Sequence, residues 1–484
     1  GGGTNKTGRN RPAARQPADR HLQRDLGTAP TPPRRRGPDP ILREPAPDPG
    51  HRHRTVRHNG RRPTGDRASR HWRGRVVRRR RRHLSPLELN RRGVGRTFQT
   101  LHGVDTVFSK AGIPIDITIV RENIEDTYGG IEHMLTHDVA LSRRFITRPG
   151  SEQVIRYAFE MAKKKGANRI TCGHKANIMK LTDGLFLEVF YEVAKQYPEL
   201  KADDVIVDDL CMKLVTRPDL FDTVVLTNLQ GDIVSDLCAG LVGGLGFAPS
   251  ANIGDHISIF EAVHGTAPDI AGKNLANPTA LLLSGIGMLQ HLGLMESSTL
   301  IENALLYTLE SGVHTGDFGS KATPALGTDA FADAIIGNFG KQPQHNPKPD
   351  LSDVAYSCTV LNLKQNPMME SEEGLQEKVV GVDMFVESNL QPTEVAEKCL
   401  LHCGSLFKLV TISNRGTQVW PTGSVFTNLV NQYRCRFESN DEAALTQQNI
   451  IDLHQSLIAD FKICSTELLN MWDGKKAYSL AQGQ

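Results

Sequence analysis

Three aspartates in the middle of the chain have the types and spacing of a divalent-metal site. Asp208 follows the apolar run 205–207, and Asp232 and Asp236 lie four residues apart in the segment that begins at Asn228. A helical turn places the carboxylates of residues four apart on one face. Such like charges repel unless a cation joins them, and hard oxygen ligands favour Mg²⁺ or Mn²⁺. Helix capping is the alternative function for Asp232.

A second polar segment, Arg121 to Tyr128, begins where a short β-branched run ends. Functional side chains are frequent where a strand passes into a loop. The guanidinium of Arg121 can hold a substrate carboxylate with two hydrogen bonds. The phenol of Tyr128 can act as a general acid when a neighbour activates it. A salt-bridged turn is the alternative.

The segment His174-Lys-Ala-Asn-Ile-Met-Lys180 places a lysine where a loop passes into a helix. Met179 and Leu181 flank Lys180, so we expect partial burial that favours its neutral, basic form. A solvated surface lysine is the alternative.

The segment from Glu261 to Gly272 is a loop of small residues that suits a nucleotide ligand. Gly265 and Gly272 permit close approach of the backbone, and Asp269 can accept hydrogen bonds from a ribose diol. An ordinary surface loop is the alternative. The glycine-rich run 240–246 lacks GxGxxG spacing, so we interpret it as close helix packing.

Alternating strands and helices are expected to position these clusters. β-branched runs predict strands at 115–120, 169–171, 205–207 and 224–226, and amphipathic spacing predicts helices at 151–165 and 182–196. This alternation predicts an α/β fold with crossover connections.

The C-terminal part, 376–484, predicts a small α+β domain of βαββα order. Strands are expected at 379–386, 407–412 and 433–437, and helices at 393–402 and 441–460. The domain carries no acid–base constellation, so we expect it to serve assembly or packing. Residues 342–375, rich in Pro, Asn, Gln, Glu and Ser, are interpreted as a linker.

The N-terminal part has a different composition. Residues 1–100 carry 27 of the 57 Lys and Arg but 7 of the 54 Asp and Glu, a net charge of about +20 against about −17 for the rest. They offer too little apolar surface to offset the entropy of ordering, so we expect a disordered leader over 1–96. An arginine-rich nucleic-acid-binding arm is the alternative, but lysine and aromatic residues are almost absent from it.

Several classes of protein are excluded by composition. There is no run of about 18 apolar residues for a membrane span, and no apolar segment follows the basic N-terminus as in a secretory signal peptide. The eight cysteines show no CxxC spacing, which argues against zinc and against a disulfide scaffold. We expect a soluble cytoplasmic protein, with the mitochondrial matrix as the alternative.

Together the four polar clusters resemble the β-decarboxylating dehydrogenases, the isocitrate/isopropylmalate dehydrogenase family. The resemblance is dense over 105–341, and His-Lys-Ala-Asn-Ile-Met-Lys-Leu-Thr-Asp-Gly is similar to the isocitrate branch. The tail, with Val-Gly-Val-Asp-Met-Phe-Val-Glu and Ile-Ser-Asn-Arg-Gly-Thr, resembles the extra domain of Thermus-type isocitrate dehydrogenases. The resemblance implies that family's sheet with flanking helices over 97–341, plus the small α+β domain.

The resemblance also implies an activity, the oxidative decarboxylation of isocitrate to 2-oxoglutarate and CO2. Arg121 matches the arginine that binds a substrate carboxylate, and Tyr128 matches the tyrosine that protonates the enolate after CO2 leaves. Lys180 matches a lysine from the second subunit that helps to deprotonate the substrate hydroxyl, with Asn177 beside it at the substrate. A homodimer at least is therefore implied.

The same resemblance implies a metal site and a cofactor site. Asp232 and Asp236, with Asp208 of the partner subunit, match the Mg²⁺ or Mn²⁺ ligands. Residues of two loops match the positions that bind the nicotinamide cofactor: Glu261, His264, Gly265, Thr266, Ala267, Asp269, Ile270, Asn277 and Asp317.

The cofactor expected from these positions is NAD, with NADP as the alternative. NADP-using relatives often place Lys-Tyr where this chain has Asp269-Ile270, and Tyr and Arg where it has Gly316 and Ser320. No cation at those four positions would meet a 2′-phosphate.

One part of the family pattern is absent from residues 1–96. The family has there a strand with a GDGIGPE-like loop and a Ser-x-Asn-x-x-x-Arg substrate helix, followed by another arginine. The Arg-Pro-Gly-His composition resembles a GC-rich coding region read out of frame, and a chain without that lobe would be impaired. Isopropylmalate or homoisocitrate oxidation and a non-catalytic regulatory subunit are the alternative functions.

Overall fold

This computed structural model describes residues 91–254, 257–345, 347–348, 376–423 and 428–479. The expected disordered leader therefore lies outside the described residues up to residue 90, and so does most of the expected linker. Residues 91–96, however, belong to strand β1 (Arg91–Gln99). The boundary expected at residue 96 thus falls inside a strand of the sheet.

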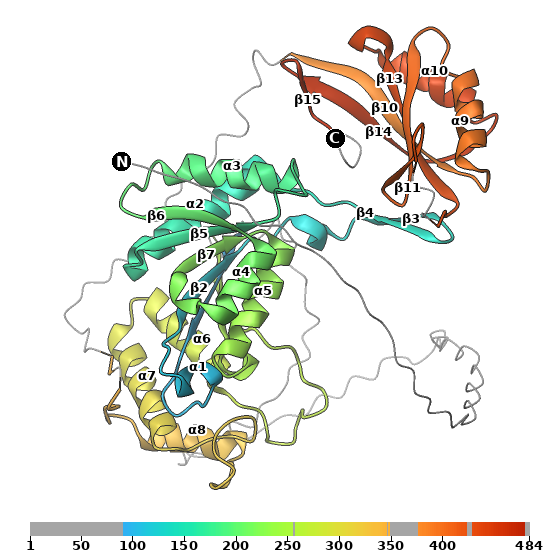
Figure 1. Cartoon of the computed structure of the whole chain (residues 1–484). Coiled ribbons are helices and arrows are strands. Elements are labelled where there is room, and N and C mark those ends of the chain that lie inside the picture. The colour runs from blue at the N-terminus through green and yellow to red at the C-terminus, as the bar shows by residue number, and fades with distance from the viewer. Residues whose placement is uncertain (1–90, 255–256, 346, 349–375, 424–427, 480–484) are drawn as a thin grey trace, which may run out of the picture. The chain divides into compact units, whose positions relative to one another are not determined.

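A seven-stranded mixed sheet forms the centre of residues 91–337 (Figure 1), in the order β6-β5-β7-β2-β1-β8-β9. Its other strands are β2 (Asp116–Arg121), β5 (Arg169–His174), β6 (Lys201–Ile206), β7 (Thr223–Leu226), β8 (Pro249–Gly254) and β9 (Ile259–Ala262). β6, β5, β7 and β2 run parallel, whereas β1 pairs antiparallel with both β2 and β8. The α/β prediction is confirmed.

Helices cover both faces of the parallel half of the sheet. Alternate residues of a strand point to opposite faces. On β2, Val120 packs with helices α2 (Arg148–Lys165) and α3 (Thr182–Ala194). Its neighbour Ile119 packs with α4 (Val207–Thr216) and α5 (Asn228–Leu241). Of these helices, α4 and α5 carry predicted site residues in their N-terminal halves, Asp208 and Asp232 respectively, and Lys180 precedes α3.

This part of the chain has further described elements outside the seven-stranded sheet. They are α1 (Val107–Lys110), η2 (Asp126–Gly129), β3 (Glu132–Thr136), β4 (Val139–Ser142), η3 (Pro218–Leu220), η4 (Leu245–Phe247), α6 (Thr279–His291), α7 (Met295–Glu310) and α8 (Thr328–Gly337). Leu305 and Leu309 of α7 and Phe331 of α8 form a separate apolar cluster with Phe247. The run 240–246 contains the end of α5 at Leu241. Gly243 follows with φ +119° and lies beside Val104 and Phe247, so the run terminates the helix and does not mediate the expected close helix packing.

Helix α2 illustrates how local sequence sets the elements. Thr147 caps its N-terminus by accepting from the amide of Gly150, and Gly166 ends it with φ 71°. Val154, Ile155 and Ala158 are buried on one face, as their spacing predicts. The strand expected at 205–207 ends at Ile206, and Val207 begins α4.

The C-terminal part is a six-stranded antiparallel sheet with two helices. Its elements are β10 (Glu377–Glu387), α9 (Pro392–Leu401), β11 (Phe407–Asn414), β12 (Thr417–Trp420), β13 (Gln432–Ser439), η5 (Asn440–Glu442), α10 (Gln447–Leu457), β14 (Lys462–Trp472) and β15 (Lys475–Lys476). The α+β prediction is confirmed, but βαββα order omits β12, β14 and β15. The sequence pattern does not predict β14 because only two of its residues, Leu469 and Met471, are buried.

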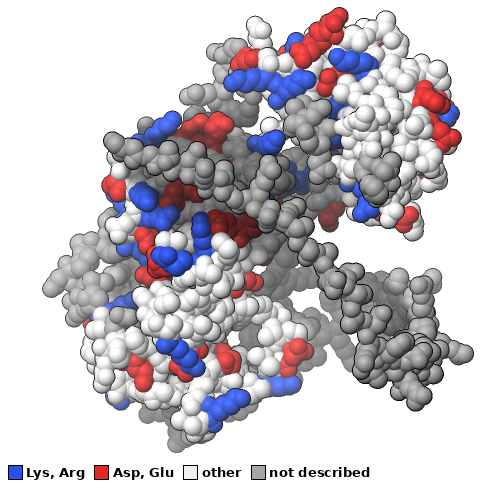
Figure 2. Space-filling view, viewed as in Figure 1, with Lys and Arg blue, Asp and Glu red and all other residues white. Residues whose placement is uncertain are grey.

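The surface of the described residues has mixed charge. On the face in Figure 2, Lys and Arg side chains are interspersed with Asp and Glu side chains. No helix among the described residues has the length and apolar character needed to cross a membrane.

Candidate functional site

Arg121, at the carboxyl end of β2, joins two of the predicted clusters. Its Nε and Nη2 donate to Oδ1 of Asn228 at 2.9 and 2.7 Å, and Nη1 donates to Oδ1 of Asp232. Both partners lie in the first turns of α5, which follows the neighbouring strand β7. The arginine is 8% exposed, so its charge faces a site with restricted access to solvent.

Tyr128 completes this group from the short helix η2. Its hydroxyl donates to Oδ2 of Asp232 at 2.7 Å, and the guanidinium of Arg121 lies 4.7 Å from its ring centroid. Partial burial and the bond to Asp232 raise the pKa of Tyr128. The phenol therefore holds its proton at neutral pH, as a general acid must.

Arg96 is a residue of this group that the sequence did not reveal. It projects from β1, its Nη1 donates to Ser235, and the same atom lies 3.9 Å from carboxylates of both Asp232 and Asp236. Burial and the neighbouring Arg121 lower its pKa, and its Nε is buried without a hydrogen-bond partner. One signal in the sequence does point to it: Arg96 stands between β-branched Val94 and Thr97, at the end of the basic stretch that the composition assigns to the leader.

The three predicted metal ligands do not gather within one chain. The side chains of Asp232 and Asp236 are 36% and 56% exposed at the rim of the Arg121 group. Asp208, in the first turn of α4, forms an ion pair with Lys175, whose hydrogen bond lowers the pKa of the carboxyl. Among the described residues no group of three or more His, Cys, Asp or Glu side chains could hold a metal ion.

Lys180 and Asn177 lie in an exposed turn between β5 and α3. Both are exposed, and so are the apolar side chains of Ile178 (70%) and Leu181 (50%). The expected partial burial of Lys180 is therefore wrong for the isolated chain. The physical reason is that Leu181 is exposed beside Lys180, while Met179 turns inward to Arg144, so neither flanking side chain covers the lysine.

Hydrogen bonds of His174 nevertheless hold the start of the turn that carries Lys180. The buried ring of His174 accepts from the amide of Ala176 through Nδ1 at 3.0 Å, so Nε2 carries the hydrogen and donates to Asp204 at 2.9 Å. Tyr191 of α3 also donates to Asp204. The turn thus begins from a defined histidine tautomer.

The expected cofactor loop is exposed from His264 to Ile270, and after it the buried Asn277 contacts the exposed Asp317. Asn277, 8% exposed, donates through Nδ2 to Asp317 at 3.1 Å and accepts from the amide of Thr279. A Cβ at Gly246 would lie 2.9 Å from both side chains. Asn277 and Asp317 are therefore brought together, whereas Gly265, Thr266, Ala267 and Asp269 are open to solvent.

A chain of amides links this loop to the Arg121 group. Asn123 donates to Asn252 at 3.1 Å, and Asn252 donates to Glu261 at 3.0 Å. Glu261 also attracts Arg96 electrostatically. The first residue of the expected cofactor segment is thus tied to the loop that follows β2.

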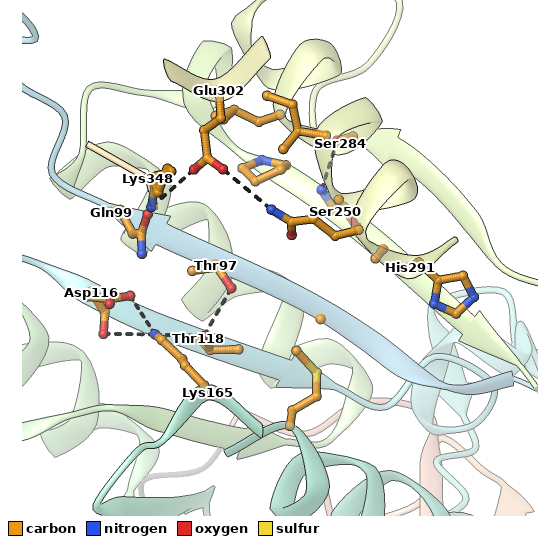
Figure 3. A pocket seen from close by; sticks show the side chains of 18 of the residues that line it. Thr97, Gln99, Asp116, Thr118, Lys165, Ser250, Ser284, His291, Glu302 and Lys348 are labelled. Carbon is orange, nitrogen blue, oxygen red and sulfur yellow. Dashed lines mark hydrogen bonds and ion pairs between the residues drawn. The ribbon is translucent and has the colours of Figure 1, made fainter. Parts of the chain in front are cut away.

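A cavity of about 1480 Å³ lies elsewhere, against β1, β2, α2, α6 and α7. Figure 3 shows that charged groups on its walls pair with one another: Lys165 with Asp116 at 2.5 Å, and Lys348 with Glu302 at 3.2 Å. None of the predicted catalytic, metal or cofactor residues lines it. The cavity is therefore not the candidate site.

Two family comparisons cover most of the described chain. A family model described as "Isocitrate/isopropylmalate dehydrogenase" matches residues 95–335. Another, described as "Bacterial isocitrate dehydrogenase, C-terminal domain", matches residues 377–484. The first match includes Arg96 and every predicted site residue.

Individual proteins agree with these matches. "Isocitrate dehydrogenase [NADP]" of Thermus thermophilus is 45% identical over 377 residues, 77% of this chain and 74% of that protein. The protein of the same name from Rickettsia bellii is 41% identical over 76% of each chain. The solved structure of TT0538 protein from Thermus thermophilus has a TM-score of 0.75 at 43% identity, covering 81% of this chain and 78% of that one.

The expectation of an NAD-dependent enzyme is wrong. Six relatives that match 76–77% of the chain are named as NADP enzymes. An NAD-named relative, catalytic subunit 5 of Arabidopsis thaliana, matches 46%. The prediction considered only four positions. It did not consider Lys273 and Lys321, exposed cations in the same two segments.

Proposed function

This chain belongs to the isocitrate/isopropylmalate dehydrogenase family, and from that premise we propose that it oxidises and decarboxylates isocitrate. The products are 2-oxoglutarate and CO2, and a nicotinamide dinucleotide accepts the hydride. NADP⁺ is the acceptor that the names of the relatives support. One arrangement carries the proposal. The hydroxyl of Tyr128 donates to Asp232, and the guanidinium of Arg121 donates to the same carboxylate and contacts the Tyr128 ring.

The two arginines of this group suit a substrate with several carboxylates. Arg121 and Arg96 lie on adjacent antiparallel strands and share the carboxylate of Asp232. The unpartnered Nε of Arg96 and the forked geometry of both guanidinium groups offer donors for carboxylate oxygens. We assign both residues to substrate binding.

Tyr128 is assigned as the proton donor. Because its pKa is raised, the phenol remains protonated at neutral pH and can deliver a proton to the carbon from which CO2 departs. Its present acceptor, Asp232, holds the hydroxyl oriented into the group of charged side chains.

The carboxylates fit a divalent metal. Asp232 and Asp236 stand one helical turn apart with exposed oxygens, and hard oxygen donors suit Mg²⁺ or Mn²⁺. They would hold the ion together with Asp208 of a second copy. When bound, the ion stabilises the negative charge that decarboxylation leaves.

We further propose that two copies share each site, in a homodimer or a larger assembly. Lys180 and Asn177 stand on an exposed turn with outward apolar side chains, and Asp208 is 69% exposed. In this assembly Lys180 of one copy acts as the base for substrate held by Arg121 of the other. Asn177 contacts the same substrate.

The cofactor is proposed to bind along the 261–277 loop and Asp317. Glu261 begins this segment beside Arg96, while Asn277 and Asp317 close it. His264, Gly265, Thr266, Ala267, Asp269 and Ile270 are exposed to meet the ligand.

The decisive test is turnover by the full chain. We expect NADPH formation with isocitrate and Mn²⁺, less with NAD⁺, and none with isopropylmalate. A preference for isopropylmalate would assign the chain to the isopropylmalate branch of the family. Absence of turnover with both acids would refute the proposed function for this chain.

A further inference from the structure

Arg144 is a largely buried arginine between β4 and α2 to which the proposed chemistry gives no part. Its side chain is 16% exposed. Nε donates to Oδ1 of Asp126 at 2.6 Å, and Nη2 donates to Oδ2 of the same carboxylate at 3.2 Å. Asp126 begins η2, the turn that carries Tyr128. Arg144 thus holds the Tyr128 turn by a bidentate pair.

The same guanidinium also holds the turn that carries Lys180. Nη1 donates to Oδ1 of Asp183 and approaches Oγ1 of Thr182 at 3.3 Å, at the start of α3. The other oxygen of Asp183 accepts from the amide of Lys175 at 2.6 Å. Asp183 therefore ties the first residue of the 175–183 segment to its last, and Arg144 holds Asp183.

The third contact of Arg144 is with the N-terminus of α5, the helix that carries Asp232. Nη2 donates to Oγ1 of Thr227 at 2.9 Å. Asp126 accepts from the amide of Leu229 at 3.0 Å, and Asp183 accepts from Nε2 of Gln230 at 2.8 Å. Both carboxylates that pair with Arg144 thus also hold this helix.

The charges of this cluster depend on one another. Asp126 and Asp183 are 1% and 0% exposed, and two buried carboxylates are tolerable only when a cation and several donors compensate them. Burial alone would raise the pKa of Asp126, but its bonds from Arg144 and from the amide of Leu229 outweigh burial and lower it. Asp126 also has φ 68°, an unfavourable backbone conformation for a residue with a side chain that these bonds hold in place.

We infer that Arg144 is a positioning residue, whose guanidinium fixes the Tyr128 turn, the Lys180 turn and the N-terminus of the Asp232 helix relative to one another. This inference rests on the proposed function for the roles of those three residues. Lysine cannot replace Arg144, because a single ammonium cannot reproduce the planar fork toward Asp126 together with the bonds to Asp183 and Thr227.

The test is Arg144→Lys in the full chain, with hydrogen exchange and steady-state kinetics measured on the same preparation. We expect faster exchange at 126–129, 175–183 and 227–231, but no change in the 264–276 loop. We expect kcat to fall about 10- to 100-fold, since small displacements of reacting groups are costly, while KM for the nicotinamide dinucleotide stays unchanged.

Arg148→Lys is the matched control. Arg148 lies four residues further along and pairs with exposed Glu188 and Glu192 on the outer side of α3. We expect wild-type kcat and wild-type exchange at the three segments.

A neutral variant covers the case in which Arg144→Lys does not fold. Arg144→Met with Asp126→Asn and Asp183→Asn removes all three charges together, so no buried charge is left unpaired. We expect this variant to fold with a similarly reduced kcat.

Wild-type kcat in either variant, or exchange that rises equally over the whole chain, would overturn the inference. Failure of the wild type to oxidise isocitrate would refute the proposed function alone, because the exchange pattern still decides the role of Arg144.

Discussion

Asp232 is the residue on which the proposed chemistry converges. One carboxylate oxygen accepts from Arg121 and the other from Tyr128, and Arg96 lies within 3.9 Å. A metal or a substrate that enters the site must exchange with these contacts. The carboxylate is thus held in one orientation before a ligand arrives, and the ligand must compensate for the bonds that it replaces.

Tyr128→Phe tests the proton donor. The variant keeps the ring under Arg121 and loses only the hydroxyl, so we expect kcat to fall about 10²- to 10⁴-fold. Because Tyr128 is 51% exposed, we expect the free energy of unfolding to stay within about 0.5 kcal/mol of wild type. Tyr307→Phe on α7 is the control, with kcat unchanged. Equal kcat in the two variants would remove Tyr128 from the mechanism.

The raised pKa of the buried Glu122 leads us to expect that the free energy of unfolding depends on pH. It is 5% exposed, and burial raises its pKa from 4.5 to about 7, although the amides of Ile124 and Glu125 donate to it. The folded state therefore binds the proton more tightly than the unfolded state. This contribution to stability is complete below about pH 4.5 and is lost as the pH rises through about 7.

Glu122→Gln should remove this dependence. Relative to wild type, we expect the variant's free energy of unfolding to rise between about pH 5 and pH 8, by at most about 3 kcal/mol. Denaturant titrations of both proteins at each pH measure it. A difference that does not change with pH would contradict the pKa of Glu122.

At the scale of elements, the site depends on how closely α5 approaches β2. A Cβ at Gly231 would lie 2.8 Å from Cβ and Cγ of Arg121. Only glycine permits this distance, and the approach brings Asp232 within reach of the arginine. The spacing of Asp232 and Asp236 could be predicted from the sequence, but the packing distance that makes Asp232 useful could not.

Gly231→Ala should push α5 away from Arg121. We expect a loss of about 1–3 kcal/mol of stability from overpacking and a higher KM for isocitrate. Gly240→Ala, in the last turn of the same helix, has no atom within 4 Å of the added Cβ. It should instead stabilise by about 0.5–1 kcal/mol with unchanged kinetics. Thermal unfolding and KM measured on both variants separate the two cases, and a higher KM in both would show that helix propensity, not distance, is responsible.

At the scale of the whole molecule, the site that we propose two copies share would account for the exposed positions of Lys180 and Asp208. We expect Tyr128→Phe and Lys180→Met each to be inactive alone. Refolding them together in equal amounts should restore about a quarter of wild-type activity, because half of the dimers then carry one intact site. Lys180→Met mixed with Asp208→Asn is the control, since both changes fall on the same copy's contribution and no intact site forms. Absence of activity in the first mixture would place Lys180 in its own chain's site.

The sequence by itself determined the family, the α/β and α+β classes and the residue types of the site, because motifs such as Arg121 to Tyr128 and His174 to Lys180 are local. The family matches confirm the family, and the structure confirms the α/β and α+β classes. The sequence by itself did not determine that β1 belongs to the sheet, or that Arg96 and Arg144 lie at the site. Arg96 and Ser235 are 139 positions apart, and they meet only because the sheet places β1 beside β2. Contacts between distant segments depend on strand order and helix packing, which no local pattern encodes, and those contacts decide which charged side chains share one site.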